Sequence, residues 1–563
     1  MFSLLNIIGI VMFFNRKISD PEEALCCIRD GTVIAVSGFN LLTTPEYLIY
    51  ELYKQYRKTG HPRNLFMVFE TLPAVPGRAF DKIAEIMYKD KDYGFIRGVL
   101  APYLGFSPWL QKLASENIIE VYSWPIGITV YWFREVASGR PGLITKIGLG
   151  TFLDPREDMG AMNDLARERK SCKVSLITIE GEEYLFYQAP KPEIALVRGS
   201  VADEMGNISL IDEAIKGTAL NIAQAAKALP KKGIVIAQVR WVTKRGTIPP
   251  REVDIPAPLV DYIVVAPGEY HWQSGSYEYD PRLSYRVIPP LDPRELGGSE
   301  IEKYSEYEHI IARRTLIELV NEVIEKKRPI LVNLGIGIPA LVSWLASYEE
   351  ISDYIVTVVE SGVWGGVALG GQDFGAAISP FALTTMPDMF SNFEGGVIDA
   401  ASLGFLEVDK EGNVNPSMLP GRLYGPGGFP VIAGGSPKTV FSGSFTAGER
   451  KIYFDPVSKR LIIEKDGSVI KFVERVYKIF FSGKYALKFG HDITYVTERA
   501  VFKLTPQGVM ITEIAPGIDI EKDILAKMKF KPIIPSTLYE MDQRIFVKGR
   551  MGLREKLLRE IKK

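Results

Sequence analysis

A glycine-rich segment follows one of the apolar runs of this chain and begins with a carboxylate. The run IVTVV at 355–359 leads directly into ESGVWGGVALGGQDFG, which starts at Glu360 and ends at Gly375. A carboxylate at the carboxyl end of a parallel strand stands where α/β sheets build their sites, and glycines let the backbone approach a ligand closely. Glu360 is therefore a candidate site residue. A solvated or capping glutamate is the ordinary alternative, which the glycines alone do not exclude.

Two further glycine clusters could present backbone N–H groups to a ligand. NLGIGIP, Asn333 to Pro339, joins a strand to the start of a helix, which suits a phosphate or a carbonyl oxygen. It is not a dinucleotide fingerprint, because GxGxxG would need a glycine where Ala340 stands. YGPGGFPVIAGG, Tyr424 to Gly435, could form an oxyanion hole, although a structural turn is the simpler interpretation.

The sequence gives little support for a triad hydrolase or for a metal site. No GxSxG elbow occurs and no cysteine has a nearby histidine in sequence, so a triad hydrolase is not supported. No CxxC, HxxxH or HExxH spacing occurs either, and we expect no metal site. The residues concerned are Cys26, Cys27, Cys172, His61, His271, His309 and His491.

Charge and composition narrow the class of protein. The 67 basic and 68 acidic residues give a net charge of -1, so we expect no binding to nucleic acid or to an anionic membrane. Three cysteines without a disulfide framework suit a reducing interior, which predicts a cytoplasmic protein.

The apolar stretch in MFSLLNIIGIVMFFN is shorter than the roughly 20 residues of a spanning helix and has no cleavage site. We assign residues 1–16 to an N-terminal extension or an upstream start, in preference to a membrane anchor.

The elements that must position these clusters alternate along the chain. Several short runs are continuously apolar, as strands buried on both faces should be; they are Thr32–Val36, Leu65–Phe69, Ile194–Val197, Ile330–Leu334 and Ile355–Val359. Between them, Pro45–Tyr56 and Ala340–Ala346 have helical apolar spacing. The fold class predicted is α/β with mostly parallel sheets.

The two halves of the chain echo each other. GTVIAVSGF leads into a helix early in the first half, as ILVNLGIGIP does in the second. Later, VADEMGNIS and LEVDKEGNVN each place an acidic residue and a Gly-Asn turn between two strands. At 563 residues the chain is too long for one core, so we predict two similar domains from a fused duplication. Their predicted bounds are 17–287 and 306–563, with a linker at 288–305 rich in Pro, Gly and charge.

Longer matches along both halves resemble one known family. NLGIGIP, ESG with GG following, GFLEVDKEGNVN and GPGGF are similar to the catalytic half of family I CoA-transferases of the fused, single-chain acetate/propionate type, relatives of the 3-oxoacid CoA-transferases. The first half of that family is matched by GLGTFLDPR, LVRGSVADEMGNIS, PREVDIPAPLVDYIVVAP and EYDPRLS. The resemblance runs from about Lys17 to Phe546 and includes YVTERAVFKLTPQGVMITEIAPGIDIEKDIL.

The resemblance implies the site. Glu360 would be the catalytic nucleophile, with Gly427 and Gly428 as oxyanion donors, in an active site between two α/β domains of the CoA-transferase type. CoA or acyl-CoA would be bound as substrate, with no permanently bound cofactor, and the chain would form a homo-oligomer. The residues assigned to CoA and acyl binding are Gly335, Ile336, Gly337, Ile338, Pro339, Gly365 and Gly366.

The implied function is transfer of CoA between an acyl-CoA and a short-chain acid of the acetate, propionate or 3-oxoacid class. The mechanism would be ping-pong, through a glutamyl-CoA thioester on Glu360. An acyl-CoA hydrolase that uses the same glutamate is one alternative, and a non-catalytic ligand sensor is another, although no DNA-binding segment is evident.

Two departures from the family pattern bear on the site. MFSNFEGGV at Met389–Val397 replaces the usual QFDFYDGGG, so we expect a different acyl pocket. Glu70 and Thr71 replace the small residues that usually follow the second strand of the first half, which makes Glu70 a competitor for the nucleophile's role.

Overall fold

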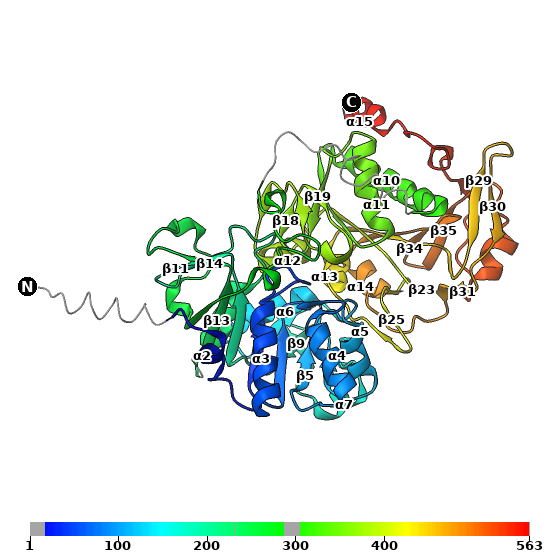
Figure 1. Cartoon of the computed structure of the whole chain (residues 1–563). Helices are drawn as coiled ribbons and strands as arrows, with labels where there is room; N and C mark the ends of the chain where they lie inside the picture. Colours follow the sequence, from blue (N-terminus) through cyan, green and yellow to red (C-terminus); the bar gives the residue numbers. More distant parts are fainter. Residues whose placement is uncertain (1–16, 231, 286–303, 562–563) are drawn as a thin grey trace, which may run out of the picture.

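The computed structural model describes residues 17–230, 232–285 and 304–561, which form two α/β domains side by side (Figure 1). The predicted α/β class with mostly parallel sheets is confirmed. The extension at 1–16 and nearly all of the predicted linker lie outside the described residues. The domain bounds given above stay predictions.

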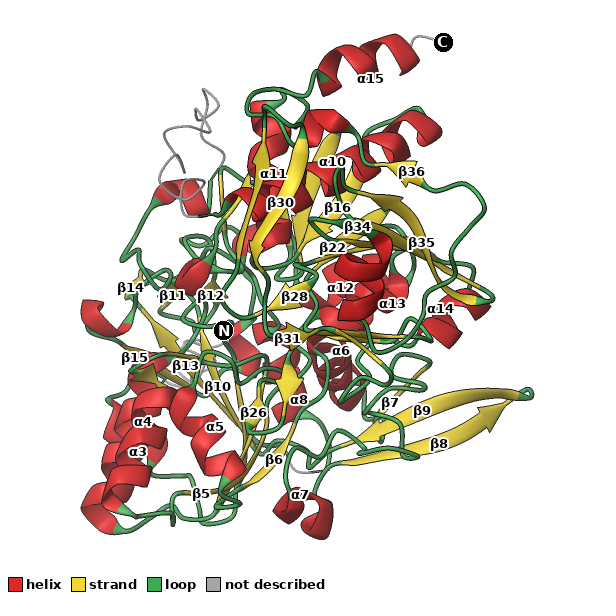
Figure 2. Cartoon of the chain, turned by 90° about the vertical axis from the view of Figure 1, so that its right-hand side faces the viewer, coloured by secondary structure: helices red, strands yellow, loops and turns green. Residues whose placement is uncertain are grey.

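The first domain is built on a seven-stranded sheet in the order β15-β13-β10-β1-β2-β5-β6, in which every pair is parallel. Its strands are β1 (Val33–Val36), β2 (Leu65–Phe69), β5 (Ile96–Leu100), β6 (Glu120–Tyr122), β10 (Ile194–Arg198), β13 (Ile234–Val239) and β15 (Tyr262–Val265). The strands are apolar and buried because helices cover the sheet. These include α3 (Glu46–Thr59), α4 (Phe80–Asp90), α5 (Pro108–Ser115), α6 (Ile126–Ala137) and α8 (Ala219–Lys227). A hairpin of β8 (Lys173–Ile179) and β9 (Glu182–Gln188) projects from this domain (Figure 2).

The second domain has a ten-stranded sheet in the order β21-β18-β17-β16-β22-β27-β33-β34-β35-β36, whose centre from β17 to β33 is parallel. The central strands are β16 (Ile330–Leu334), β17 (Ile355–Val359), β22 (Ala400–Leu403), β27 (Lys438–Ser442) and β33 (Asp492–Val496). The flanking ones are β18 (Val363–Trp364), β21 (Ala382–Leu383), β34 (Ala500–Thr505), β35 (Gly508–Ile514) and β36 (Tyr539–Glu540). Its helices include α10 (Glu306–Lys326), α11 (Ile338–Tyr348), α12 (Met386–Glu394), α13 (Phe429–Gly435) and α15 (Leu553–Ile561).

The two sheets share one strand order. β2-β1-β10-β13-β15 of the first domain corresponds to β17-β16-β22-β27-β33 of the second, so β1 and β16 take the same place. Each domain also carries a small sheet with one antiparallel and one parallel pair: β12 (Ile208–Ser209), β11 (Val201–Asp203) and β14 (Trp241–Thr243), and then β24 (Val414–Asn415), β23 (Glu407–Asp409) and β32 (Phe472–Val473). This order supports the predicted duplication.

The two Gly-Asn turns are alike down to their hydrogen bonds. Asp203 accepts from the backbone N–H and the side-chain amide of Asn207, both at 3.0 Å. Asp409 accepts from the same two groups of Asn413, at 3.0 and 3.1 Å. An aspartate that satisfies turn N–H groups stabilises such a turn, which explains why both halves keep the same residues.

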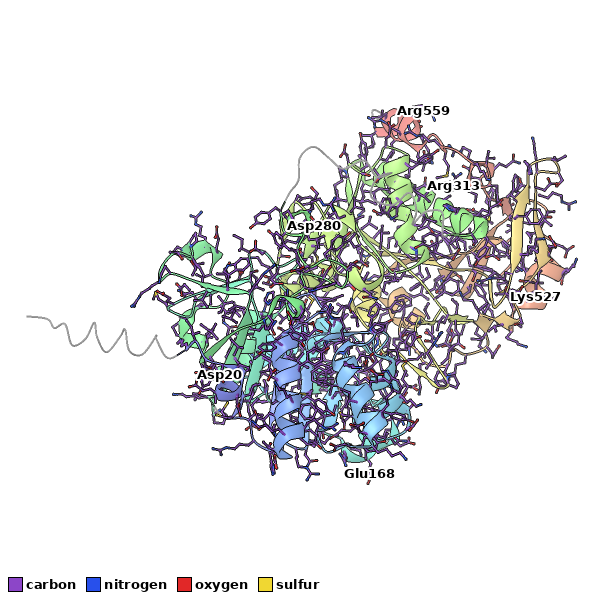
Figure 3. All side chains as sticks on the ribbon, in the orientation of Figure 1. Asp20, Glu168, Asp280, Arg313, Lys527 and Arg559 are labelled. Carbon is purple, nitrogen blue, oxygen red and sulfur yellow. The ribbon has the colours of Figure 1, made fainter. Side chains whose placement is uncertain are left out.

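Charged side chains mostly point to solvent, as Asp20, Glu168 and Arg559 do, but some fasten segments together (Figure 3). Arg313 on α10 is buried and donates to the carbonyl of Gly549 at 2.7 Å, which ties the C-terminal segment to the second domain. None of the described helices is both long and apolar enough to cross a membrane.

Candidate active site

A cavity of about 330 Å³ lies between the two domains. Its volume falls at the lower end of the roughly 300–1,000 Å³ range of small-molecule sites. Glu360, Gly335, Ile336, Gly427 and Gly428 line it from the second domain. The first domain contributes Phe39, Asn40, Thr71, Leu72, Tyr103, Phe106 and Ile126. Among the described lining residues there is one carboxylate and no lysine, arginine or histidine.

Glu360 is the first residue after β17. The chain turns back at once into β18, with the N–H of Gly362 bonded to the Val359 carbonyl at 3.0 Å. Gly362 has a φ of 104°, and a Cβ there would lie 2.0 Å from the Thr384 carbonyl oxygen, so this turn requires glycine. The turn holds Glu360 at the cavity wall, where the residue is 6% exposed.

Burial raises the pKa of Glu360 to about 7, against an ordinary value of 4.5. Hydrogen bonding by the Glu360 backbone and the Asn333 side chain opposes that rise in pKa. Asn333, at the end of β16, is itself buried, lines the cavity and donates to the Val358 carbonyl at 3.0 Å. Asn333 belongs to the predicted NLGIGIP cluster, but the sequence assigned it no role.

Gly428 lies against Glu360. A Cβ placed on Gly428 would touch Cγ and Oε1 of Glu360 at 3.5 Å and would lie 2.9 Å from Cδ1 of Ile432, so the two residues are direct neighbours. Gly428 is the residue before α13, whereas the N–H of Gly427 is bonded to the Pro102 carbonyl at 2.9 Å. Of the two predicted oxyanion donors, Gly428 is favoured because the N–H of Gly427 already has a partner.

The seven predicted CoA-binding residues lie in three places. Gly335 and Ile336 line the cavity, whereas Gly337, Ile338 and Pro339 form the start of α11 and do not. Gly365 and Gly366 lie in the turn after β18, where a Cβ would meet the Phe381 ring at 2.3 Å and the Ile378 carbonyl oxygen at 2.5 Å respectively. These two glycines permit close packing of that turn. The assignment of all seven to CoA binding stays a prediction.

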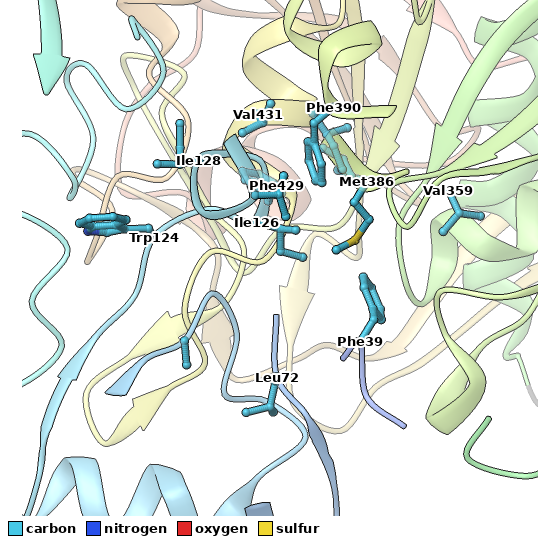
Figure 4. Packing of buried hydrophobic residues seen from close by; sticks show 14 of the residues in the cluster. Phe39, Leu72, Trp124, Ile126, Ile128, Val359, Met386, Phe390, Phe429 and Val431 are labelled. Carbon is cyan, nitrogen blue, oxygen red and sulfur yellow. The ribbon is translucent and has the colours of Figure 1, made fainter. Parts of the chain in front are cut away.

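Glu70, the competing carboxylate, is the first residue after β2 and so occupies in the first domain the place that Glu360 has in the second. It is completely buried and does not line the cavity, although its neighbour Thr71 does. The replacement segment Met389–Val397 is also absent from the lining; Phe390 packs beside Val431 and near Ile126 (Figure 4). A different acyl wall from that segment is therefore not apparent.

The first-domain wall is what sequence reasoning missed. Phe39, Asn40, Thr71 and Leu72 follow β1 and β2, which were recognised as strands. Because the carboxyl ends of parallel strands are where α/β sheets bind ligands, the strand ends were the available signal. Tyr103 and Phe106 lie in an irregular segment, and no spacing marked them.

The sequence of this chain is similar to those of known proteins along nearly its full length. A sequence profile described as coenzyme A transferase matches residues 18–266. The caffeate CoA-transferase of Acetobacterium woodii is 38% identical over 544 residues, which cover 95% of this chain and 98% of that protein. This chain belongs to the coenzyme A transferase family. The transferase is therefore an enzyme that acts on acyl-CoA, and the alternative of a non-catalytic ligand sensor is set aside.

Two further relatives are similar to the transferase over nearly its full length. The acetate CoA-transferase YdiF of Escherichia coli K12 is 35% identical over 539 residues, which cover 94% of this chain and 94% of that protein. A crystal structure of the acyl-CoA transferase YdiF apoenzyme from E. coli O157:H7 has a TM-score of 0.83 at 33% identity, and covers 96% of this chain and 98% of its own. A second structure of that enzyme, with the same TM-score, is a thioester complex with CoA.

Proposed function

We propose that this transferase moves CoA from an acyl-CoA to a free carboxylic acid through a thioester on Glu360. The observation that carries the proposal is the interdomain cavity, in which Glu360 is the single buried carboxylate among the described lining residues and Gly428 lies beside it. The thioester complex named for the E. coli relative supports the same intermediate here.

In the first half-reaction, the Glu360 carboxylate attacks the thioester carbon, the C–S bond breaks and CoA leaves as its thiolate. The resulting mixed anhydride joins Glu360 to the acyl group. The thiolate then attacks the glutamyl carbonyl carbon and expels the first acid as a carboxylate. A second carboxylate reverses these steps on the glutamyl-CoA thioester. One thioester replaces another, so the exchange is close to neutral in free energy.

The surroundings of Glu360 favour its attack. A carboxylate in a mostly apolar cavity is less solvated and more basic than one in water, and the fixed turn after β17 aligns it with the substrate. The N–H of Gly428 is the donor for the oxyanion that forms at each tetrahedral step. Removing one such donor typically lowers kcat about 10²- to 10³-fold.

We infer further that the acyl group carries no second carboxylate. The described lining residues offer no basic side chain, and an unpaired carboxylate in an apolar cavity is strongly disfavoured. The relatives named for caffeate and acetate, both monocarboxylates, agree with this substrate class. Butyrate and succinate are a matched pair of four-carbon acceptors. We expect butyrate to be preferred about 100-fold in kcat/KM, and equal use of the two acids would contradict the inference.

The nucleophile is tested by reduction, because borohydride reduces a thioester but not a carboxylate. The enzyme is incubated with acetyl-CoA, treated with borohydride, and its peptides are mapped by mass. We expect inactivation that requires acetyl-CoA, protection by acetate, and the alcohol at Glu360. Reduction at Glu70 instead, or unchanged activity, would refute the assignment. Continuous release of free CoA in the absence of an acceptor acid would identify a hydrolase.

A further inference from the structure

Glu70 is a buried carboxylate that the proposed mechanism does not use. It follows β2 as Glu360 follows β17, yet none of its surface is exposed and it lies outside the cavity lining. No ion pair to it occurs among the described residues. A carboxylate in such a place is expensive to bury, so its contacts should explain why it is there.

One carboxylate oxygen of Glu70, Oε2, accepts the N–H of Gly38 at 2.6 Å. The next residue, Thr71, donates its hydroxyl to the Gly38 carbonyl at 2.7 Å. Gly38 has a φ of 136°, and a Cβ there would lie 2.0 Å from the Thr44 hydroxyl oxygen, so no other residue fits this turn. Glu70 and Thr71 therefore hold both polar groups of the glycine that begins the turn.

This turn leads directly to the cavity. Phe39 and Asn40 follow Gly38, and both line the cavity with Glu360. The Asn40 side-chain amide donates to the carbonyl of Phe374 at 3.1 Å, and Phe374 is a lining residue of the second domain. The rings of Phe39 and Phe374 lie with centroids 5.8 Å apart. The position of Gly38 thus decides how the walls from the two domains meet.

The other oxygen, Oε1, faces Gly217, where a Cβ would lie 2.8 Å away. The Gly217 carbonyl accepts the N–H of Met386, the first residue of α12 in the second domain. Oε1 is buried without a hydrogen-bond partner among the described residues. Burial raises the pKa of Glu70 to about 7, while the hydrogen bond from Gly38 opposes the rise. A neutral carboxyl group keeps the oxygen that accepts from Gly38, so the contact does not depend on ionisation.

We propose that Glu70 is a positioning residue for the acyl substrate: its carboxyl oxygen fixes Gly38 and so sets Phe39 and Asn40 at the cavity wall. The inference rests on the proposed transfer at Glu360. It assigns Glu70 to substrate binding, in contrast to Glu360, which acts in the chemical step.

Two substitutions separate the hydrogen bond from the charge. Glu70→Gln keeps an oxygen that can accept from Gly38, whereas Glu70→Leu keeps the bulk and removes the acceptor. Because a buried N–H would lose its partner, we expect Glu70→Leu to raise the KM for the acid about tenfold. We expect its kcat per active site, counted by borohydride trapping, to fall less than about threefold. Glu70→Gln should stay within about twofold of the wild type in both values.

A matched control is Glu120→Gln. Glu120 is equally buried at the start of β6 in the same sheet, but it pairs with Arg97 and does not line the cavity. This variant should keep the wild-type KM even if its melting temperature falls. If Glu70→Leu does not fold, Glu70→Met offers a flexible side chain of similar length that also lacks the carboxyl oxygen.

The outcomes distinguish this inference from the proposed function. A wild-type enzyme that forms no thioester on Glu360 would overturn both. If the thioester forms and removal of the acceptor leaves the KM for the acid unchanged, the positioning role alone is refuted. A KM that rises as much in Glu70→Gln as in Glu70→Leu would also refute it, because the charge would then matter in place of the hydrogen bond.

Discussion

Glu360 has to be ionised to attack, yet its burial favours the neutral acid. The pKa of about 7 means that both forms are populated near neutral pH. The cavity thus gives the glutamate the basicity of a stronger nucleophile while leaving an ionised fraction at work. Protonation of Glu360 should therefore affect both the rate and the stability of the enzyme.

The rate of thioester formation should rise with pH and level off above about 7, where Glu360 is ionised. Well below that value, each unit of pH lowers the ionised fraction of Glu360 about tenfold. A plot of log kcat/KM for acetyl-CoA against pH should therefore approach a slope of one. Rapid-quench measurement of acetate released from labelled acetyl-CoA, from pH 5 to 9, gives the profile. A rate that is flat across pH 7 would contradict this assignment.

The stability of the folded protein should fall with rising pH, whereas the rate rises. The pKa of Glu360 is higher in the folded state, about 7, than the 4.5 of an unperturbed glutamate, so the native state loses stability as pH rises through about 7. Glu360→Gln cannot ionise and should be more stable than the wild type at pH 8, by up to about 3 kcal/mol. Thermal melts at pH 4 and pH 8 test this, since the difference should vanish at the lower pH.

At the scale of elements, the residues at the start of helix α13 lie directly beside the nucleophile Glu360. Gly427 and Gly428 precede this helix, and the first domain holds their turn through bonds from Ile126 N–H to the Gly427 carbonyl and from Gly427 N–H to the Pro102 carbonyl, both 2.9 Å. The helix start is therefore fixed from the opposite domain, and Gly428 is kept beside Glu360.

Gly428→Ala should impair catalysis without unfolding the protein. Its φ of -80° and ψ of -15° suit alanine, but the methyl group would lie 2.9 Å from Cδ1 of Ile432, which must shift, and would fill the space beside the Glu360 carboxylate at 3.5 Å. We expect kcat to fall at least about tenfold, with a melting temperature within a few degrees of the wild type. Gly434→Ala, in the same helix with only Ile147 near its Cβ, is the control and should keep full activity. Equal kcat in the two variants would argue against crowding at Gly428.

The sequence predicted these elements better than their roles. Apolar runs identified β1, β2, β10, β16 and β17, since strands buried on both faces leave a strong local signal. The sequence could not predict that the N–H of Gly427 donates to a carbonyl of the other domain. Nor could it predict that Gly365 and Gly366 allow close packing of the turn after β18. These outcomes depend on contacts between segments far apart in the chain, which local patterns do not contain.

At the scale of the whole molecule, the cavity depends on how the domains dock. Helix α6 of the first domain packs against α12 and α13 of the second, where Gly127 leaves room for Phe390 and Val431 (Figure 4). Arg134 on α6 forms an ion pair with Asp388 on α12 at 2.8 Å. The duplication was readable from paired motifs, whereas the first-domain cavity wall required the docked structure.

Gly127→Val should disturb this docking. A Cβ at 127 would lie 2.7 Å from the Phe390 ring and 2.9 Å from Val431, and overpacking of this kind destabilises by about 1–3 kcal/mol. Because the same contact supports the turn before Gly428, we expect kcat/KM to fall as well, by about tenfold. Gly370→Val, where nothing lies within 4 Å of the Cβ, is the control. Thermal melts and steady-state kinetics of both variants make the comparison.

Because both domains line the cavity, its completeness does not depend on the concentration of the enzyme. Phe39, Asn40 and Leu72 reach Glu360 on the same polypeptide, so the complete wall described here forms in a fixed one-to-one ratio at any protein concentration. Diluting the enzyme in an assay cannot separate these partners. Specific activity should therefore stay constant down to nanomolar enzyme, whatever assembly the chains form, and a site that borrowed a residue from a second copy would instead lose activity as the copies part.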